Sequence, residues 1–153
     1  MTTKEPLPCD LPAPTALAFL GDAAFGLLVR QALVEKGTSD SGKLHKASLA
    51  YVTAAAQARF FRRIKEHLSD YEADLCRRAY NNSHLNKPKK ASFEDYRCAT
   101  ALEALFGYLH YTHQSERSAA LFALCRIEEN EDYSENLRHS GPFPQGYRAV
   151  SPH

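Results

Sequence analysis

The first strongly apolar segment of the chain, from Thr15 to about Glu35, predicts a core helix. Apolar residues fill nearly every position of its first half, ALAFLGDAAFGLLV, and polar positions recur only toward its end. Prolines make residues 1–13 a poor helix, and Thr15 or the segment just before it can cap the helix that follows. Gly37 then supplies a natural C-terminal stop.

Two consecutive helices are predicted in the next stretch, KLHKASLAYVTAAAQARFFRRIKEHL. Its apolar positions share one side of a helix, at Leu44, Leu49, Val52 and Ala56. Its basic positions lie on the other sides. We expect a break at residues 51–53, because Thr53 can cap a new helix there.

Serine residues mark the starts of the next two helices. Ser69 is followed by Glu72 at the spacing of a capping box, which predicts a helix to about Tyr80. Ser92 can cap the helix FEDYRCATALEALFGYLHYTH, whose first turn carries acids, as the helix dipole prefers. Between them, residues 81–92 (NNSHLNKPKKAS) have the composition of an exposed loop, and their basic character makes them a candidate functional loop.

The pattern as a whole predicts an all-α fold of about six to seven helices. The last helix is expected from about Ser115 to Glu129, and no hairpin signature or internal repeat is visible. We expect a flexible N-terminal segment over residues 1–13, a helical domain over residues 14–129 and a polar C-terminal tail over residues 130–153.

Composition indicates an ordinary globular chain. Its 153 residues suffice for one domain with one hydrophobic core. No run approaches the roughly 20 uninterrupted apolar residues of a membrane-spanning helix, and the N-terminus lacks the pattern of a secretory signal. The four cysteines form no C-x-x-C pair, and Cys98 and Cys125 lie in apolar helical stretches, where we expect buried thiols. These features predict a cytoplasmic protein with no membrane partner.

Charge is distributed unevenly along the chain, although the net charge is only +1. A local concentration of charge, more than the total, sets the electrostatic potential that a partner meets. Acids gather near the C-terminus, from Glu128 to Glu135. Basic residues gather in the middle, at Arg59, Arg62, Arg63, Lys65, Arg77, Arg78, Lys87, Lys89, Lys90 and Arg97.

Two single acids stand out in apolar helices. Asp22 lies within LAFLGDAAFGLL and Glu103 within CATALEALFGYL, so that we expect both at or near the core. A glycine accompanies each acid, Gly21 in one helix and Gly107 in the other. Because a glycine inside a helix costs up to about 1 kcal/mol against alanine, its presence suggests that another backbone approaches closely. Two helices that cross tightly there would bring the acids together.

A buried carboxylate needs a cation or hydrogen-bond donors, and two such groups repel each other unless a divalent cation or a proton lies between them. Oxygen-only ligands suit Mg²⁺. The alternative is structural: each acid pairs with an Arg, a His or a hydroxyl group of the core. A metal-dependent oxidoreductase of the helical, carboxylate-bridged class is disfavoured, because neither acid belongs to a Glu-x-x-His pair.

Several segments resemble the ribonuclease III family in the same order. LAFLGDAAF is similar to its signature helix, and CATALEALFGYLHY is similar to its second acidic helix. KLHKASLAYVTAAAQA, RRAYNN and KPKKASFEDYRCAT resemble stretches that distinguish the Mini-ribonuclease III group, which has the catalytic domain without a double-stranded-RNA-binding domain. The resemblance covers roughly residues 15–125.

The resemblance implies an endoribonuclease that dimerises and hydrolyses double-stranded RNA to 5′-phosphate products, with Mg²⁺ as cofactor and Mn²⁺ able to substitute. Its substrate would be the 23S ribosomal RNA precursor. Asp22 and Glu103 become the catalytic metal ligands, and Thr100 holds a metal-bound water. The RNA backbone would be contacted by Lys46, Arg77, Arg78, Asn81, Lys87, Lys89 and Lys90.

The chain departs from larger relatives at two positions near the acids. Those relatives carry an acid one turn before each of the two acids, where this chain has Ala18 and Thr100. The Mini-type pattern also has small or hydroxyl residues there, but the ligand set is thinner. Gly26 replaces a Glu that is usual in the first motif. An alternative is therefore a non-catalytic protein that retains the fold and binds double-stranded RNA.

Overall fold

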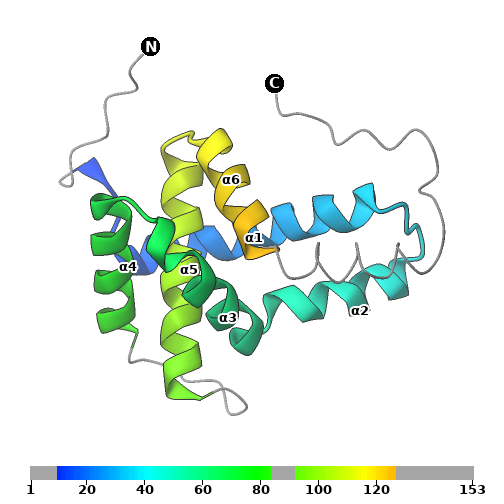
Figure 1. The fold of residues 1–153 in the computed structure, drawn as a ribbon, viewed down its shortest axis with the longest axis horizontal. Coiled ribbons are helices and arrows are strands. Elements are labelled where there is room, and N and C mark those ends of the chain that lie inside the picture. The colour runs from blue at the N-terminus through cyan, green and yellow to red at the C-terminus, as the bar shows by residue number, and fades with distance from the viewer. Residues whose placement is uncertain (1–9, 84–91, 127–153) are drawn as a thin grey trace.

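The computed structural model describes residues 10–83 and 92–126, and it contains helices and no strand in those ranges (Figure 1). The expected all-α class is confirmed. The helices are α1 (Pro14–Glu35), α2 (Ser41–Val52), α3 (Ala54–Ile64), α4 (Asp70–Asn82), α5 (Phe93–Tyr111) and α6 (Ser115–Cys125), with a 3₁₀ turn, η2 (Lys65–His67), after α3. Residues 1–9 of the expected N-terminal segment, and the whole of the tail over 130–153, lie outside the described residues.

The N-cap of α1 lies in the segment just before Thr15, the second of the two expected positions. Thr15 lies inside the helix, and the N-cap residue Ala13 has no side chain that could accept a hydrogen bond. Pro14 takes the first helical position, which suits it because its φ is fixed near the helical value and it lacks an N–H. At the other end Gly37 has φ of 90° and its amide donates to Val34 O at 3.0 Å, so the predicted stop is confirmed.

Side-chain caps explain where α2, α3, α4 and α5 begin. Asp40 accepts a hydrogen bond from the Lys43 amide at 2.8 Å at the start of α2. Thr53 accepts one from the Ala56 amide at 3.3 Å, which confirms the predicted break between α2 and α3. The predicted caps of α4 and α5 are also confirmed, the former as a complete capping box between Ser69 and Glu72 and the latter as Ser92.

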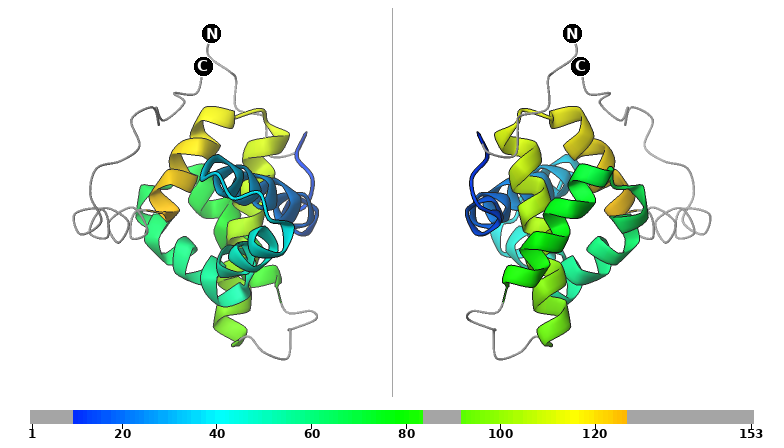
Figure 2. Two further views of the ribbon diagram at one scale, coloured as in Figure 1. Left: turned by 90° about the vertical axis from the view of Figure 1, so that its right-hand side faces the viewer. Right: turned by 90° about the vertical axis from the view of Figure 1, so that its left-hand side faces the viewer.

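Helix α5 runs through the centre of the molecule, and α1, α3 and α4 pack around it (Figure 1). From Cys98 to Leu109, every residue of α5 except Thr100 and Glu103 is buried. Helix α1 runs across α5 at a steep angle in Figure 1, and it is seen nearly end-on in the views turned by 90° (Figure 2). This arrangement puts the polar positions of α5 beside α1.

Aromatic packing fills the space between these helices. The ring of Phe25 in α1 lies 5.2 Å from that of Phe106, 5.7 Å from that of Phe122 and 6.3 Å from that of Phe60, measured between centroids. Although α1 is long and apolar enough to cross a membrane, it packs against α5, as a helix of a protein core does. The expected apolar side of the second helix is partly wrong, because Leu49 is 45% exposed.

The thiols of the core are packing groups. Cys76, Cys98 and Cys125 are free and buried, which confirms the expectation for the last two. Burial raises the pKa of Cys125 to about 12 and also raises that of Cys98. These thiols therefore stay protonated at neutral pH, and they act as small hydrophobic side chains.

Candidate active site

The backbones of α1 and α5 touch at two glycines. A Cβ atom added to Gly21 would lie 1.5 Å from the Glu103 carbonyl oxygen, and one added to Gly107 would lie 1.8 Å from the Leu17 carbonyl oxygen. Real Cβ atoms do not approach heavy atoms so closely, so the two helices can cross at this depth only because both positions are glycine. The predicted close approach of two backbones is confirmed.

The crossing brings the two acids together. Gly21 precedes Asp22 and touches the backbone of Glu103, so both acids belong to the same contact. Burial of the Glu103 carboxyl group, and then the nearby negative charge of Asp22, raise the pKa of Glu103 to about 8. The charge of Asp22 disfavours the ionised form of Glu103, so the two carboxyl groups interact electrostatically across the crossing.

The two acids differ in burial, which corrects the expectation that both lie at or near the core. Glu103 is half-buried, but Asp22 is exposed. Helix α1 buries Leu17, Gly21 and Phe25 against α5, and Asp22 projects from the edge of that stripe. The sequence did not reveal this edge because the solvent side of α1 is apolar too.

Thr100 lies one turn before Glu103 on α5 and is half-buried. Its hydroxyl group donates a hydrogen bond to the Tyr96 carbonyl oxygen at 3.0 Å. The hydroxyl oxygen can still accept a hydrogen bond, so the structure is compatible with its predicted role of holding a water. At the matching position of α1, Ala18 is buried.

Gly26, one turn after Asp22, lies against an arginine of its own helix. Arg30 Nη1 donates to the Gly26 carbonyl oxygen at 3.3 Å. A Cβ atom at position 26 would meet the same nitrogen at 2.9 Å. Arg30 therefore occupies the space that the side chain of a Glu at position 26 would enter.

The predicted RNA-binding residues do not form one cluster. Arg77 and Arg78 lie on α4 and both pair with Asp74, at 2.7 and 3.0 Å, and Asn81 is exposed one turn further on. Lys46 is exposed on α2, which lies toward the opposite end of the long axis from α4 (Figure 1). The predicted contacts Lys87, Lys89 and Lys90 fall outside the described residues.

The donor set near Glu103 fits a magnesium ion. Within residues 10–83 and 92–126 no group of three or more His, Cys, Asp or Glu residues could hold a metal. The candidate ligands are the two interacting acids, Asp22 and Glu103. Mg²⁺ is commonly bound by one or two carboxylates, with water and substrate phosphates completing its shell. A carboxyl group whose pKa is raised by burial and by a second acid gains most from a bound cation.

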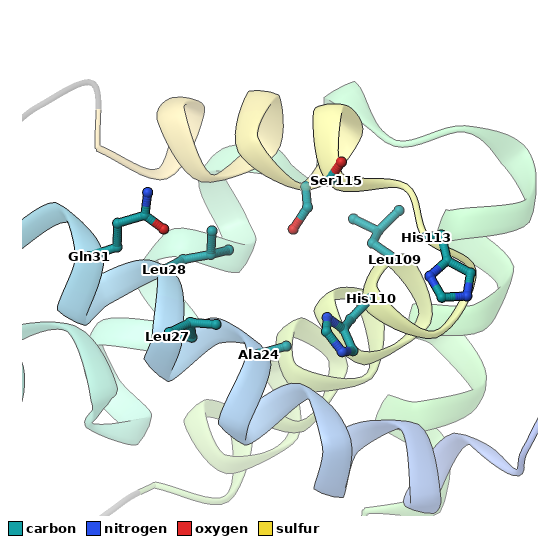
Figure 3. Close-up of a pocket in the computed structure, with 9 residues that line it drawn as sticks. Ala24, Leu27, Leu28, Gln31, Leu109, His110, His113 and Ser115 are labelled. Atoms are coloured by element: carbon teal, nitrogen blue, oxygen red, sulfur yellow. The ribbon is translucent and has the colours of Figure 1, made fainter. Parts of the chain in front are cut away.

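Two features near this site were not assigned from the sequence. Arg97 packs against the rings of Tyr80 and Phe93, a contact signalled only by an aromatic residue four positions before Arg97. The second is a pocket of about 290 Å³ between α1, the end of α5 and the start of α6 (Figure 3). Its apolar wall includes Leu27 and Leu109, and His110 is among its polar residues.

Several known proteins are similar to this chain in sequence. A family model described as the ribonuclease III domain matches residues 15–114, which include both acids. The chain is 40% identical over 119 residues to the Mini-ribonuclease 3 of Brevibacillus brevis, a match that covers 78% of this chain and 87% of that protein. It is 38% identical to the Mini-ribonuclease 3 of Streptococcus pneumoniae over 72% of this chain and 88% of that protein.

A solved structure has a similar fold. The crystal structure of a protein from Fusobacterium nucleatum superimposes with a TM-score of 0.68 at 28% sequence identity. The match covers 73% of this chain and 91% of that protein. The helical arrangement described above is thus shared by a protein of known structure.

Proposed function

Because the chain belongs to the ribonuclease III family, whose members are endoribonucleases that act on double-stranded RNA, we propose that Asp22 and Glu103 hold the Mg²⁺ with which it cleaves such RNA. The observation that carries this proposal is the half-buried Glu103, whose pKa is raised to about 8 by burial and by the neighbouring Asp22. Carboxyl groups that are perturbed by desolvation and by a specific charged neighbour are characteristic of functional sites.

The residues of the crossing have distinct tasks in this proposal. Glu103 supplies a carboxylate with little access to water, and its position is fixed because its own backbone touches Gly21. Asp22 supplies a second carboxylate on the exposed side of α1, from which a phosphodiester can approach. Thr100 accepts a hydrogen bond from a water beside the site. When bound, Mg²⁺ supplies Lewis-acid polarisation of the phosphate and lowers the pKa of the attacking water.

The exposed face of α1 supports a homodimer. Phe19 is 86% exposed, and Leu27 and Val34 are each 61% exposed. With Ala23, these residues recur at helical spacing on one side of α1, and the pocket beside α6 continues that side at Leu27. Apolar surface of this kind marks an interface, and we propose that a second copy of the chain covers it. A two-fold dimer would carry two sites, one for each strand of a duplex.

We further propose that the natural duplex lies in the 23S ribosomal RNA precursor and that the enzyme acts in the cytoplasm. The support for the substrate is the similarity to Mini-type proteins. The buried free thiols support a reducing compartment. Incubation with precursor fragments and with unrelated duplexes of equal length, followed by mapping of the product ends, tests the substrate.

A cleavage assay on long duplex RNA with Mg²⁺ tests the central proposal. We expect Asp22→Asn and Glu103→Gln to lose at least a hundredfold in rate, since each removes a ligand charge. Glu116→Gln, which changes an exposed acid at the start of α6, serves as the matched control and should cleave like the parent protein. A parent protein that binds duplex RNA but never cleaves it with Mg²⁺ or Mn²⁺ would overturn the proposal.

The outcome just described would instead favour the second candidate, a non-catalytic protein that binds double-stranded RNA. What favours that candidate is the thin donor set, because Ala18 and Thr100 add no carboxylate to Asp22 and Glu103. The two candidates share the expectation that binding weakens as salt concentration rises, since both depend on phosphate contacts. Cleavage alone separates them.

A further inference from the structure

Arg97 on α5 is held by two aromatic rings that come from different helices. Its guanidinium carbon lies 4.2 Å from the ring centroid of Phe93, at the start of α5, and 5.2 Å from that of Tyr80, near the end of α4. These two helix ends lie at the same end of the molecule (Figures 1 and 2). Contact with both rings restricts the orientations that the guanidinium plane can take.

The carboxylates nearest to Arg97 in the sequence are engaged by other side chains. The Tyr80 hydroxyl donates to Glu94 Oε2 at 2.5 Å, and Arg62 Nη2 pairs with Asp95 Oδ1 at 2.9 Å. Among the described residues no carboxylate forms an ion pair with Arg97, and its Nε is buried without a hydrogen-bond partner. A fixed guanidinium group with no anionic partner in that part of the chain is suited to an anion from outside.

Arg97 lies on the same helix as Glu103 of the candidate active site. Arg97 precedes Glu103 by six residues on the same helix, which separates their Cα atoms by about 9 Å along the axis. Helical side chains lean toward the N-terminus, so the guanidinium group extends away from Glu103 to lie over Phe93. The same offset turns Arg97 by about 120° around the helix from Glu103, so a duplex bound at the crossing would meet Arg97 with a different backbone phosphate, farther along its strand.

We propose that the guanidinium group of Arg97, held between Tyr80 and Phe93, is a preformed binding site for a second backbone phosphate of double-stranded RNA, apart from the scissile one. This inference rests on the proposed function, because it takes RNA as the ligand. The planar fork of an arginine can donate two parallel hydrogen bonds to a phosphate, and prior fixation by two rings lowers the entropy that binding costs. Arg97 is therefore a substrate-positioning residue, separate from the two metal ligands.

The test is the salt dependence of duplex RNA binding, measured with a chelator present so that no cleavage occurs. We expect Arg97→Gln to weaken binding about tenfold and to reduce the slope of log affinity against log salt by about one. Arg62→Gln is the matched control, because it removes one positive charge from a guanidinium that Asp95 already engages. It should leave both quantities close to those of the parent protein.

A second measurement separates phosphate binding from a purely structural clamp. Thermal unfolding of Arg97→Gln should stay within a few degrees of the parent. Arg97→Lys keeps the charge but lacks the planar fork, so it should retain the slope while binding about threefold more weakly. If Arg97→Gln does not fold, Arg97→Lys decides, and binding equal to that of the parent would overturn the proposal.

Equal losses of slope in Arg97→Gln and Arg62→Gln would also overturn it, since they would indicate a general effect of net charge. Failure of the proposed function has a different signature. In that case the parent protein itself would not bind or would not cleave duplex RNA. Loss of the phosphate site would change binding in the variant alone.

Discussion

Gly21 and Gly107 face each other where α1 crosses α5, and a Cβ atom on either one would come within 3 Å of the amide nitrogen of the other. The contact is between backbones, so no rotation of a side chain can relieve a clash there. Placement of Asp22 and Glu103 depends on this contact, since each acid belongs to one of the two touching segments. Helix packing and the candidate chemistry are therefore set by the same two residues.

Substitution of either glycine should destabilise the protein. We expect Gly21→Ala or Gly107→Ala to lower the free energy of unfolding by about 3 kcal/mol or more, because an added methyl group must push the helices apart. Urea denaturation measures the loss. Gly42→Ala is the control, since its Cβ atom would meet only the exposed side chain of Asp40, at 3.3 Å, and its effect should stay within about 1 kcal/mol.

Neutralising Glu103 should stabilise the protein. Its pKa is about 8 in the fold against 4.5 for an unperturbed carboxyl group, so the folded protein retains a proton that the unfolded chain releases. Stability therefore falls as pH rises from about 4.5 to about 8. Glu103→Gln removes this dependence and should raise the free energy of unfolding by about 1–3 kcal/mol at pH 8, with little effect at pH 4.

Thermal melts with and without Mg²⁺ extend this test. A bound cation stabilises the folded state by mass action, so Mg²⁺ should raise the melting temperature of the parent protein and should not raise that of Glu103→Gln. Glu116→Gln should respond to Mg²⁺ like the parent protein. A Mg²⁺ response that is the same in the Glu103 variant would remove Glu103 from the ligand set.

Local signals allowed most helix boundaries to be predicted. Thr53, Ser69 and Ser92 each accept a hydrogen bond from an amide three residues later, so their role depends on neighbours in the sequence only. The glycines beside the two acids were informative for a similar reason, because a glycine inside a helix is costly wherever it occurs.

Properties that depend on tertiary packing could not be predicted. Both sides of α1 are apolar, so the pattern did not show which side is buried, and Asp22 was placed too deep. Arg117 pairs with Glu72 across 45 residues, and Arg97 contacts Tyr80 from another helix. Such partners become visible only when the helices are assembled.

The ion pair between Arg117 and Glu72 predicts an asymmetry between two variants. Burial raises the pKa of Glu72, but hydrogen bonds from Arg117 and from the Ser69 amide outweigh it, so the pKa lies below its usual value. The Glu72 side chain is 5% exposed and that of Arg117 is 36% exposed. Arg117→Gln should therefore lower the free energy of unfolding by about 2–4 kcal/mol, because it leaves a buried charge unpaired. Glu72→Gln should lower it by less.

Low pH should reduce the difference in unfolding free energy between Arg117→Gln and Glu72→Gln. Because the folded pKa of Glu72 is lowered, the pair contributes its full stability above the unfolded pKa near 4.5 and loses it as pH falls through the folded value. In Arg117→Gln the carboxyl group is protonated at a higher pH, which relieves its burial. Urea titrations at pH 7 and pH 4 measure this, and a gap between the variants that stays constant with pH would contradict the prediction.

The apolar face of α1 predicts that dimerisation can be disrupted by one charge. Phe19→Glu places a carboxylate at the most exposed large apolar side chain of the described residues, where a second copy would have to bury it without a partner. We expect sedimentation to show a monomer at concentrations where the parent is a dimer. Leu49→Glu, at a position 45% exposed on α2, is the matched control and should remain dimeric.

Because each copy carries its own Asp22 and Glu103, the Phe19 variant should still bind Mg²⁺ but cut duplex RNA one strand at a time. A parent protein that sediments as a monomer at every concentration would show that another partner covers this face.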